Sequence, residues 1–133
     1  MINFQHYFKE EYQFTLKSID YTLIEKTADD LQLNVSDTVS LEQIERQFQV
    51  DFCRRLCFKP EALYDLKVVF QITLTLKDDM NVDALDKESL NKEFLNPENP
   101  YLNNVVGRAS ALIAQITAAY GLTPIITPPN LII

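Results

Sequence analysis

Hydrophobic and polar residues alternate along two consecutive stretches in the middle of the chain, residues 44–58 and 63–77. A period of two is the pattern of a β-strand with one buried face. The apolar face of the first stretch is expected to carry Ile44, Phe48, Val50, Phe52, Leu56 and Phe58. The apolar face of the second is expected to carry Tyr64, Leu66, Val68, Phe70, Ile72, Leu74 and Leu76. The turn-forming residues 59–62, "KPEA", lie between them, so the two stretches predict a long antiparallel hairpin.

Two further strands are predicted upstream of this hairpin. Residues 11–24 carry apolar positions in two phases: Tyr12, Phe14 and Leu16, then Ile19, Tyr21 and Leu23. A β-bulge near Lys17 and Ser18 explains the change, because a slip of one residue turns every later side chain to the other face. Residues 31–35 alternate as well and predict a fourth, shorter strand. The chain therefore opens with about four antiparallel strands whose apolar face needs a cover.

The remaining part of the chain predicts two helices that supply this cover. Residues 81–96 form a weakly amphipathic pattern. Asn99 and Pro100 mark the start of a second helix, because Asn is a favoured N-cap and proline suits the first helical position. Its apolar residues recur at spacings of three and four: Leu102, Val105, Val106, Ala109, Leu112, Ile113, Ile116 and Tyr120. Gly121 is a predicted C-cap and Pro124 prevents continuation, so the last residues are expected to be extended.

These elements predict an α+β fold, a four-stranded antiparallel sheet with two C-terminal helices packed on one face. The second helix has no polar face, since small residues lie opposite its Leu and Ile stripe: Gly107, Ser110, Ala111, Ala114, Thr117 and Ala118. Small residues let another backbone or sheet approach closely. A membrane span is disfavoured, because Arg108 and Gln115 interrupt the apolar run. Burial between two layers fits better, and one small domain does not obviously supply both, so we expect an oligomer.

Composition and charge narrow the class of protein. The chain has 133 residues, 47% of them hydrophobic and 23% charged, which is typical of a single globular domain spanning 1–133. Its net charge is −7, and Arg108 is the only charged residue after position 98, so the first 98 residues carry −8. This acidic balance disfavours binding to nucleic acid or to an anionic membrane surface.

The N-terminal residues and the cysteines indicate a cytoplasmic protein. The first residues contain no basic segment followed by an apolar one, so no secretion signal is predicted. Cys53 and Cys57 would lie on one face of a strand about 13 Å apart, at about 3.3 Å per residue, which is too far for a disulfide. We therefore expect reduced thiols in the cytoplasm.

Candidate catalytic residues are scarce. His6 is the one histidine, and two glycines in the whole chain exclude a glycine-rich phosphate loop. Asp79, Asn81 and Asp83 match the first ligand positions of a calcium loop. The loop glycine is replaced by Ala84 and the final glutamate by Leu90, so no calcium site is expected. The sequence predicts that the protein is not an enzyme and holds no metal or cofactor.

The C-terminal third resembles the SecB family of bacterial export chaperones, and more closely its divergent SecB-like members. The matching signature is an Asn99-Pro100-Tyr101 start, an uncharged final helix, and a proline-rich tail. The tail positions that match are Gly121, Leu122, Pro124, Pro128 and Pro129. Together with the order of strands, the resemblance extends over residues 10–132. It implies a dimer of dimers whose helices are sandwiched between sheets, which would bury a helix that has no polar side.

The resemblance also implies a function, that of a holdase that binds unfolded or precursor polypeptides without ATP during protein export. Family members hold these clients in apolar grooves lined by the second strand, the preceding loop, the final helix and the loop between helices. Mapped onto this chain, the groove residues are Leu31, Leu33, Val35, Phe94, Leu95, Tyr101, Leu112, Ile113, Ile116 and Tyr120. Several such anchors are required, since micromolar affinity needs about −8.2 kcal/mol net and each buried side chain contributes roughly 1.5–3 kcal/mol.

The chain departs from typical members in ways that keep alternatives open. Its first inter-strand loop, "EKTADD", is short, Lys67 lies where the outer sheet face is usually acidic, and the chain stops at Ile133. Binding to the translocase motor SecA is therefore not favoured. Some SecB-like relatives instead chaperone the antitoxin of a toxin–antitoxin pair, which is one alternative. A non-chaperone module, in which the apolar helix only cements an oligomer or caps one partner, is another.

Overall fold

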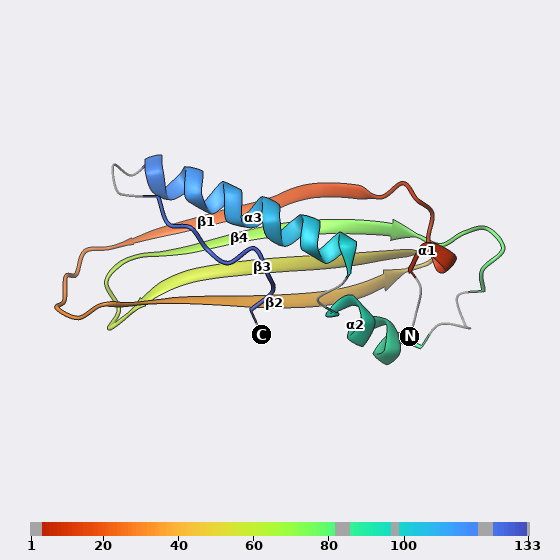
Figure 1. Ribbon diagram of the computed structural model, residues 1–133, viewed down its shortest axis with the longest axis horizontal. Helices are drawn as coiled ribbons and strands as arrows, with labels where there is room; N and C mark the ends of the chain where they lie inside the picture. The colour runs from red at the N-terminus through yellow and green to blue at the C-terminus, as the bar shows by residue number, and fades with distance from the viewer. Residues whose placement is uncertain (1–3, 82–85, 97–98, 120–123, 133) are drawn as a thin grey trace.

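Four antiparallel strands form a single open sheet in the order β1-β4-β3-β2 (Figure 1). The computed structural model describes residues 4–81, 86–96, 99–119 and 124–132. The strands are β1 (Gln13–Ile24), β2 (Gln32–Ile44), β3 (Gln47–Lys59) and β4 (Leu63–Thr75). The helices are α1 (Phe4–Tyr7), α2 (Lys87–Phe94) and α3 (Pro100–Ala119). α2 and α3 lie on the same face of the sheet, as the sequence predicts.

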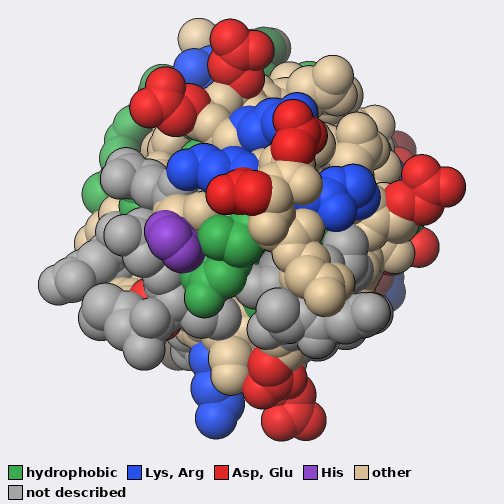
Figure 2. All heavy atoms as spheres, turned by 90° about the vertical axis from the view of Figure 1, so that its right-hand side faces the viewer, with side chains coloured by type: hydrophobic (Ala, Val, Ile, Leu, Met, Phe, Trp, Pro, Cys, Tyr) green, Lys and Arg blue, Asp and Glu red, His purple; other side chains and the backbone are tan. Residues whose placement is uncertain are grey.

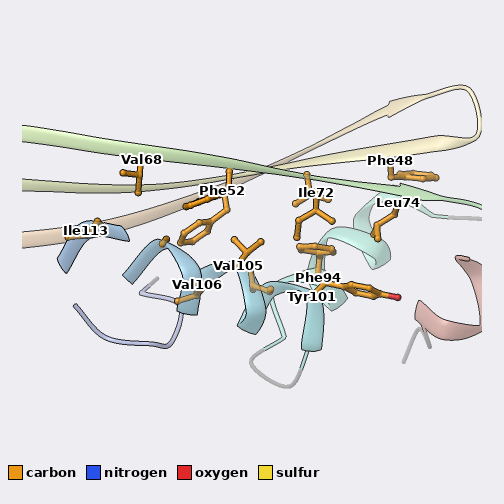
Figure 3. Close-up of a cluster of buried hydrophobic side chains, with 14 of the residues drawn as sticks. Phe48, Phe52, Val68, Ile72, Leu74, Phe94, Tyr101, Val105, Val106 and Ile113 are labelled. Atoms are coloured by element: carbon orange, nitrogen blue, oxygen red, sulfur yellow. The ribbon is translucent and has the colours of Figure 1, made fainter. Parts of the chain in front are cut away.

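The core lies between this face and the two C-terminal helices (Figure 3). The central strands β3 and β4 contribute alternate residues, and Phe52, Val68 and Ile72 are at most 1% exposed. From the other side, Val105 and Ile113 of α3 are fully buried and Phe94 of α2 is 1% exposed. The alternate residues of the strands and the residues spaced by three or four in α3 thus pack against each other in one apolar layer.

The predicted bulge in β1 is confirmed, because the register with β4 shifts between Leu16 and Ser18. Before the shift Leu16 pairs with Phe70, and after it Ile19 pairs with Val68. Phe70 and Val68 both point to the core, so the bulge keeps the apolar residues of β1 on the helix side along the whole strand.

Two details of the predicted sheet are wrong. β2 continues to Ile44 instead of ending near residue 35, because it pairs with β3 along its whole length and Asp37 occupies an apolar-phase position that hid the alternation. Ile44 does not share a face with Phe48, since Ile44 pairs with Gln47 and is 45% exposed. Glu45, with φ of 57°, forms the turn between β2 and β3, so Ile44 belongs to the preceding strand and its phase does not carry over.

The helix ends follow ordinary capping chemistry. The Oδ1 atom of Asn99 accepts a 2.9 Å hydrogen bond from the N–H of Tyr101, which confirms Asn99 as the N-cap of α3. α2 is shorter than the predicted range 81–96, because Asp86 caps it immediately before Lys87. Residues 82–85 and the predicted C-cap Gly121 lie outside the described residues. None of the described helices combines the length and hydropathy that a bilayer span needs.

The N-terminal residues contribute more to the core than the sequence indicated. α1 was not predicted, and the Phe8 side chain that follows it is fully buried. The Phe8 ring contacts the Phe48 ring edge-on at 5.5 Å between centroids, and Phe8 pairs with Leu76 in an isolated bridge. The chain therefore closes the end of the sheet at which β4 terminates.

Candidate functional site

The helices cover the apolar face of the sheet incompletely along β1. α3 packs on β3 and β4, and its first half also meets the start of β1 through Arg108 and Phe14. There the Tyr12 and Tyr101 rings meet edge-on at 4.8 Å, and the Arg108 guanidinium lies 4.9 Å from the Phe14 ring centroid. Beyond Phe14 four large apolar side chains stay exposed. These are Leu16 (44%), Ile19 (44%), Tyr21 (41%) and Leu23 (60%), which together we call the β1 flank.

A second apolar surface lies on the opposite edge of the same face. Leu31 and Val35 are half-buried, and Leu33 is 42% exposed. Leu33 pairs with Phe58 and Val35 with Leu56, so both side chains point to the helix side. We call Leu31, Leu33 and Val35 the β2 flank. Of the seven large apolar side chains that are exposed among the described residues, five follow the two edges of this face, and Ile44 and Ile126 lie elsewhere. Exposed apolar side chains grouped in this way indicate surfaces that bind another chain.

The C-terminal tail, residues 124–132, lies between α3 and β2. Figure 1 shows it leaving the far end of α3 and running back beside the helix toward β2. It is held by Arg54 of β3, whose Nη1 donates to the Thr127 hydroxyl at 2.9 Å and to the Pro128 carbonyl at 2.6 Å. Arg54 Nη2 donates to the Asn130 carbonyl at 3.0 Å.

Asp37 of β2 completes this arrangement. Its carboxylate oxygens accept hydrogen bonds from Nε and Nη2 of Arg54, each at 2.7 Å, and one of them also accepts the N–H of Ile132 at 2.8 Å. Neither side chain of the ion pair is exposed. All five guanidinium N–H groups of Arg54 therefore have an acceptor, which is the condition under which a buried charge is tolerated.

The small-residue side of α3 contacts the tail. The Ser110 hydroxyl donates to the Thr127 carbonyl at 2.7 Å, and the Thr117 hydroxyl accepts the N–H of Ile125 at 2.8 Å. Thr117 is 1% exposed, and Gly107, Ser110 and Ala114 are half-buried. The close approach that these small residues were expected to allow is thus used, at Ser110 and Thr117, by the chain's own tail.

The outer face of the sheet has a different character. Asp51 accepts hydrogen bonds from Lys17 at 2.6 Å and from Gln71 at 2.9 Å, so these polar side chains cross three strands. Arg55 and Asp65 form a second pair, at 2.6 and 3.0 Å. The hydrogen bond to Arg55 holds the pKa of the Asp65 carboxyl below its usual value, and the same bond raises the pKa of Arg55. This face needs no cover.

No arrangement suited to catalysis is found among the described residues. In that part of the chain, no three His, Cys, Asp or Glu side chains are grouped to hold a metal ion. His6 is exposed, and Cys53 and Cys57 are half-buried free thiols on β3. Figure 2 shows the end of the molecule near α1, where acidic and basic side chains are interspersed over the surface. Such a surface is that of a solvated domain end.

Comparison with known proteins finds a solved structure with this architecture. No protein-family model and no curated protein sequence matches the chain. A solved structure of a SecB-like chaperone from Mycobacterium tuberculosis, in complex with a ChAD peptide from the HigA1 antitoxin, does match, with a TM-score of 0.64. The match covers 88% of this chain and 89% of that chain at 10% sequence identity. The chain has a SecB-like fold. The resemblance inferred from the C-terminal motif is confirmed at the level of the fold.

Within this SecB-like fold, the ten predicted client-binding residues separate into three groups. Phe94 and Ile113 are at most 1% exposed and Tyr101 is 7% exposed, so these three belong to the core in this conformation. Burial also raises the pKa of the Tyr101 phenol, with smaller contributions from Tyr12 and Glu10. The half-buried or exposed residues are Leu31, Leu33, Val35, Leu95, Leu112 and Ile116. Tyr120 lies outside the described residues.

Arg54 and Asp37 are the residues that sequence reasoning missed. Arg54 stands in the apolar phase of β3, between Phe52 and Leu56, and this mismatch is a signal that the sequence does contain. Asp37 similarly occupies the apolar phase of β2, between Val35 and Val39. Two opposite charges in the apolar phases of paired strands predict a buried ion pair, once the register that places Asp37 opposite Arg54 is known.

Proposed function

We propose that this protein is an ATP-independent holdase that binds extended apolar segments of unfolded polypeptides on the helix side of its sheet. The observation that carries the proposal is the pair of apolar flanks along β1 and β2, on the face opposite the polar, ion-paired one. Apolar burial is non-directional, so such a surface suits clients of varied sequence. The solved SecB-like chaperone with an antitoxin peptide supports a chaperone role for this fold.

The free energies of burial and binding require several contacts for each client. Burying one large apolar side chain contributes roughly 1.5–3 kcal/mol, and micromolar binding needs about −8.2 kcal/mol after the ordering of a flexible chain. The β2 flank alone offers three anchors. More than one groove, or grooves from more than one subunit, would supply the rest, and this favours an oligomeric holdase.

We assign the β1 flank to contact between subunits and the β2 flank to clients. β1 is an edge strand with a row of four exposed large apolar residues, and edge strands of this kind associate unless they are protected. In a dimer of dimers, burial of this edge would remove the aggregation hazard. The β2 flank, beside the tail, would remain open to unfolded precursor polypeptides in the cytoplasm.

A second candidate is a chaperone dedicated to one partner, such as an antitoxin. The observation that favours it is the solved SecB-like structure, whose bound peptide comes from an antitoxin. A dedicated chaperone would need the same flanks but would recognise one sequence. A role in protein export through SecA has less support, because Lys67 makes the outer face of β4 less acidic.

The test measures aggregation of two unrelated, chemically unfolded proteins, without nucleotide, at a one-to-one ratio to the oligomer. The holdase proposal expects suppression of both, together with binding of a hydrophobic dye by the isolated oligomer. Suppression of neither, with no dye binding, would contradict the holdase proposal. It would favour a non-chaperone module whose apolar helix only joins subunits or caps one partner. Binding of a single partner while both test proteins aggregate would identify the dedicated chaperone.

A further inference from the structure

We propose that the C-terminal tail, residues 124–132, occupies in cis a peptide-binding groove between α3 and β2, and that an extended, uncharged apolar segment of a client exchanges with it. This inference rests on the proposed holdase function. The groove is formed by Ser110 and Thr117 on one wall and by the Arg54–Asp37 ion pair on the other. The tail would then be an intramolecular occupant that competes with clients.

The groove contacts the tail mainly through the tail's backbone. Arg54 donates to the carbonyls of Pro128 and Asn130, and Asp37 accepts the N–H of Ile132. On the helix side, Ser110 donates to the carbonyl of Thr127 and Thr117 accepts an amide N–H. The hydroxyl of Thr127 is the one tail side chain among these contacts. Every polypeptide offers the same carbonyl and amide groups, so these contacts do not depend on the sequence of the occupant.

The tail's apolar side chains are exposed or only half-buried. Ile126 is 77% exposed, and Pro128, Pro129 and Asn130 are also exposed. Ile125 and Leu131 pack on the core but are only half-buried. Only Thr127 is fully buried in the tail, and it is small and polar. An incoming segment with larger apolar residues would therefore keep the backbone contacts and gain burial, which is the condition for exchange.

The electrostatics of the groove define the class of occupant. Asp37 neutralises Arg54 within the groove, and residues 124–132 contain no charged side chain. A charged residue at the buried position of Thr127, against this pair, would lose its hydration without finding an opposite partner. The groove therefore fits an uncharged apolar segment, and its own occupant, which contains three prolines, has that composition.

A disulfide across the groove tests the exchange. The hydroxyl oxygens of Ser110 and Thr127 lie 3.0 Å apart, so Ser110→Cys with Thr127→Cys places two thiols close enough to bridge. Cys53 and Cys57 are replaced by serine in the same protein and in its matched control, which keeps Ser110 and Thr127. The first probe is a fluorescent peptide with the sequence of residues 124–132, and the second is a labelled, permanently unfolded protein.

We expect both probes to bind the reduced protein and the control, and to bind the oxidised protein at least about tenfold more weakly, with recovery on reduction. Equal affinity of the unfolded protein for the oxidised and reduced forms would overturn the inference, as would failure of the tail peptide to bind the reduced form. Exchange of the tail peptide without any binding of the unfolded protein would uphold the groove and overturn the holdase proposal instead.

Hydrogen exchange on the unsubstituted protein gives a second measurement that does not depend on the cysteine variants. The amides of Ile125 and Ile132 donate to Thr117 and Asp37 and should be protected. Saturating tail peptide should accelerate their exchange at least about tenfold while amides of β3 and β4 stay unchanged. Unchanged protection of Ile125 and Ile132 would show that the tail does not leave the groove, and this would overturn the inference.

Discussion

Arg54 and Asp37 face each other across β3 and β2 as a bidentate ion pair, with both nitrogen–oxygen distances at 2.7 Å and neither side chain exposed. The same two groups hold the carbonyls of Pro128 and Asn130 and the amide of Ile132. One ion pair thus joins two strands to a segment more than 70 residues away in the chain. Its removal should affect the sheet and the tail together.

Asp37→Asn is predicted to lower the free energy of unfolding by about 3–5 kcal/mol, because it leaves the buried Arg54 charge without a counter-charge. Urea denaturation measures the loss. The matched control is Asp65→Asn, which removes the partner of Arg55, an arginine 46% exposed on the outer face. That change should cost about 0–1 kcal/mol. Equal losses from the two substitutions would contradict the buried role of Asp37.

The sheet could be predicted from the sequence because its physical cause is local. Alternation at a period of two shows which residues of β3 and β4 are buried, and the change of phase in β1 shows the bulge. The Arg54–Asp37 pair could not be predicted in this way. It needs the β2–β3 register and the position of the tail, both of which are set by contacts between distant parts of the chain.

The candidate site was predictable only in part, for a related reason. The apolar residues of α3 recur at helical spacing whether they face the sheet or a client, so Ile113 and Leu112 look equivalent in the sequence. Packing separates them, since Ile113 is fully buried and Leu112 is half-buried. On the strands, Leu33 and Ile44 likewise look similar, but the turn at Glu45 assigns Ile44 to β2, where an odd number of positions separates it from Leu33 and puts it on the opposite face.

The Arg55–Asp65 pair predicts a small dependence of stability on pH. Because hydrogen bonding to Arg55 lowers the folded-state pKa of Asp65, the unfolded state binds its proton first as the pH falls. The stabilisation is therefore fully present above about pH 4, the usual carboxylate range, and is lost as the pH falls through the lower folded-state pKa. Urea denaturation between pH 3 and 7 should show a smaller change for Asp65→Asn than for the unsubstituted protein. Identical pH profiles would contradict the prediction.

Leu33→Ser is predicted to weaken binding of an unfolded polypeptide about tenfold, since it removes one apolar anchor of the β2 flank, and a tenfold change corresponds to about 1.4 kcal/mol. Fluorescence anisotropy with a labelled unfolded protein measures the change. Ile44→Ser is the matched control, because Ile44 lies on the same strand with similar exposure, 45% against 42%, but on the outer face. Equal weakening by both substitutions would show that clients do not distinguish the two faces.

Ile19→Lys combined with Leu23→Lys is predicted to dissociate the proposed oligomer. Both side chains belong to the β1 flank, at 44% and 60% exposure, and two lysines there would have to bury their charge in an apolar contact between subunits. Light scattering after size-exclusion chromatography should show a species of half the mass or less, with an unchanged circular dichroism spectrum.

The control for this pair is Leu33→Lys on the β2 flank. If β1 joins subunits and β2 receives clients, Leu33→Lys should retain the full mass of the oligomer but lose client binding. The β1 variant should instead dissociate into smaller species. The bulge between Leu16 and Ser18 keeps Ile19 and Leu23 on the same face as Leu33, so the two variants alter two edges of one face. A β1 variant of unchanged mass, beside a dissociated Leu33→Lys, would reverse the assignment of the two flanks.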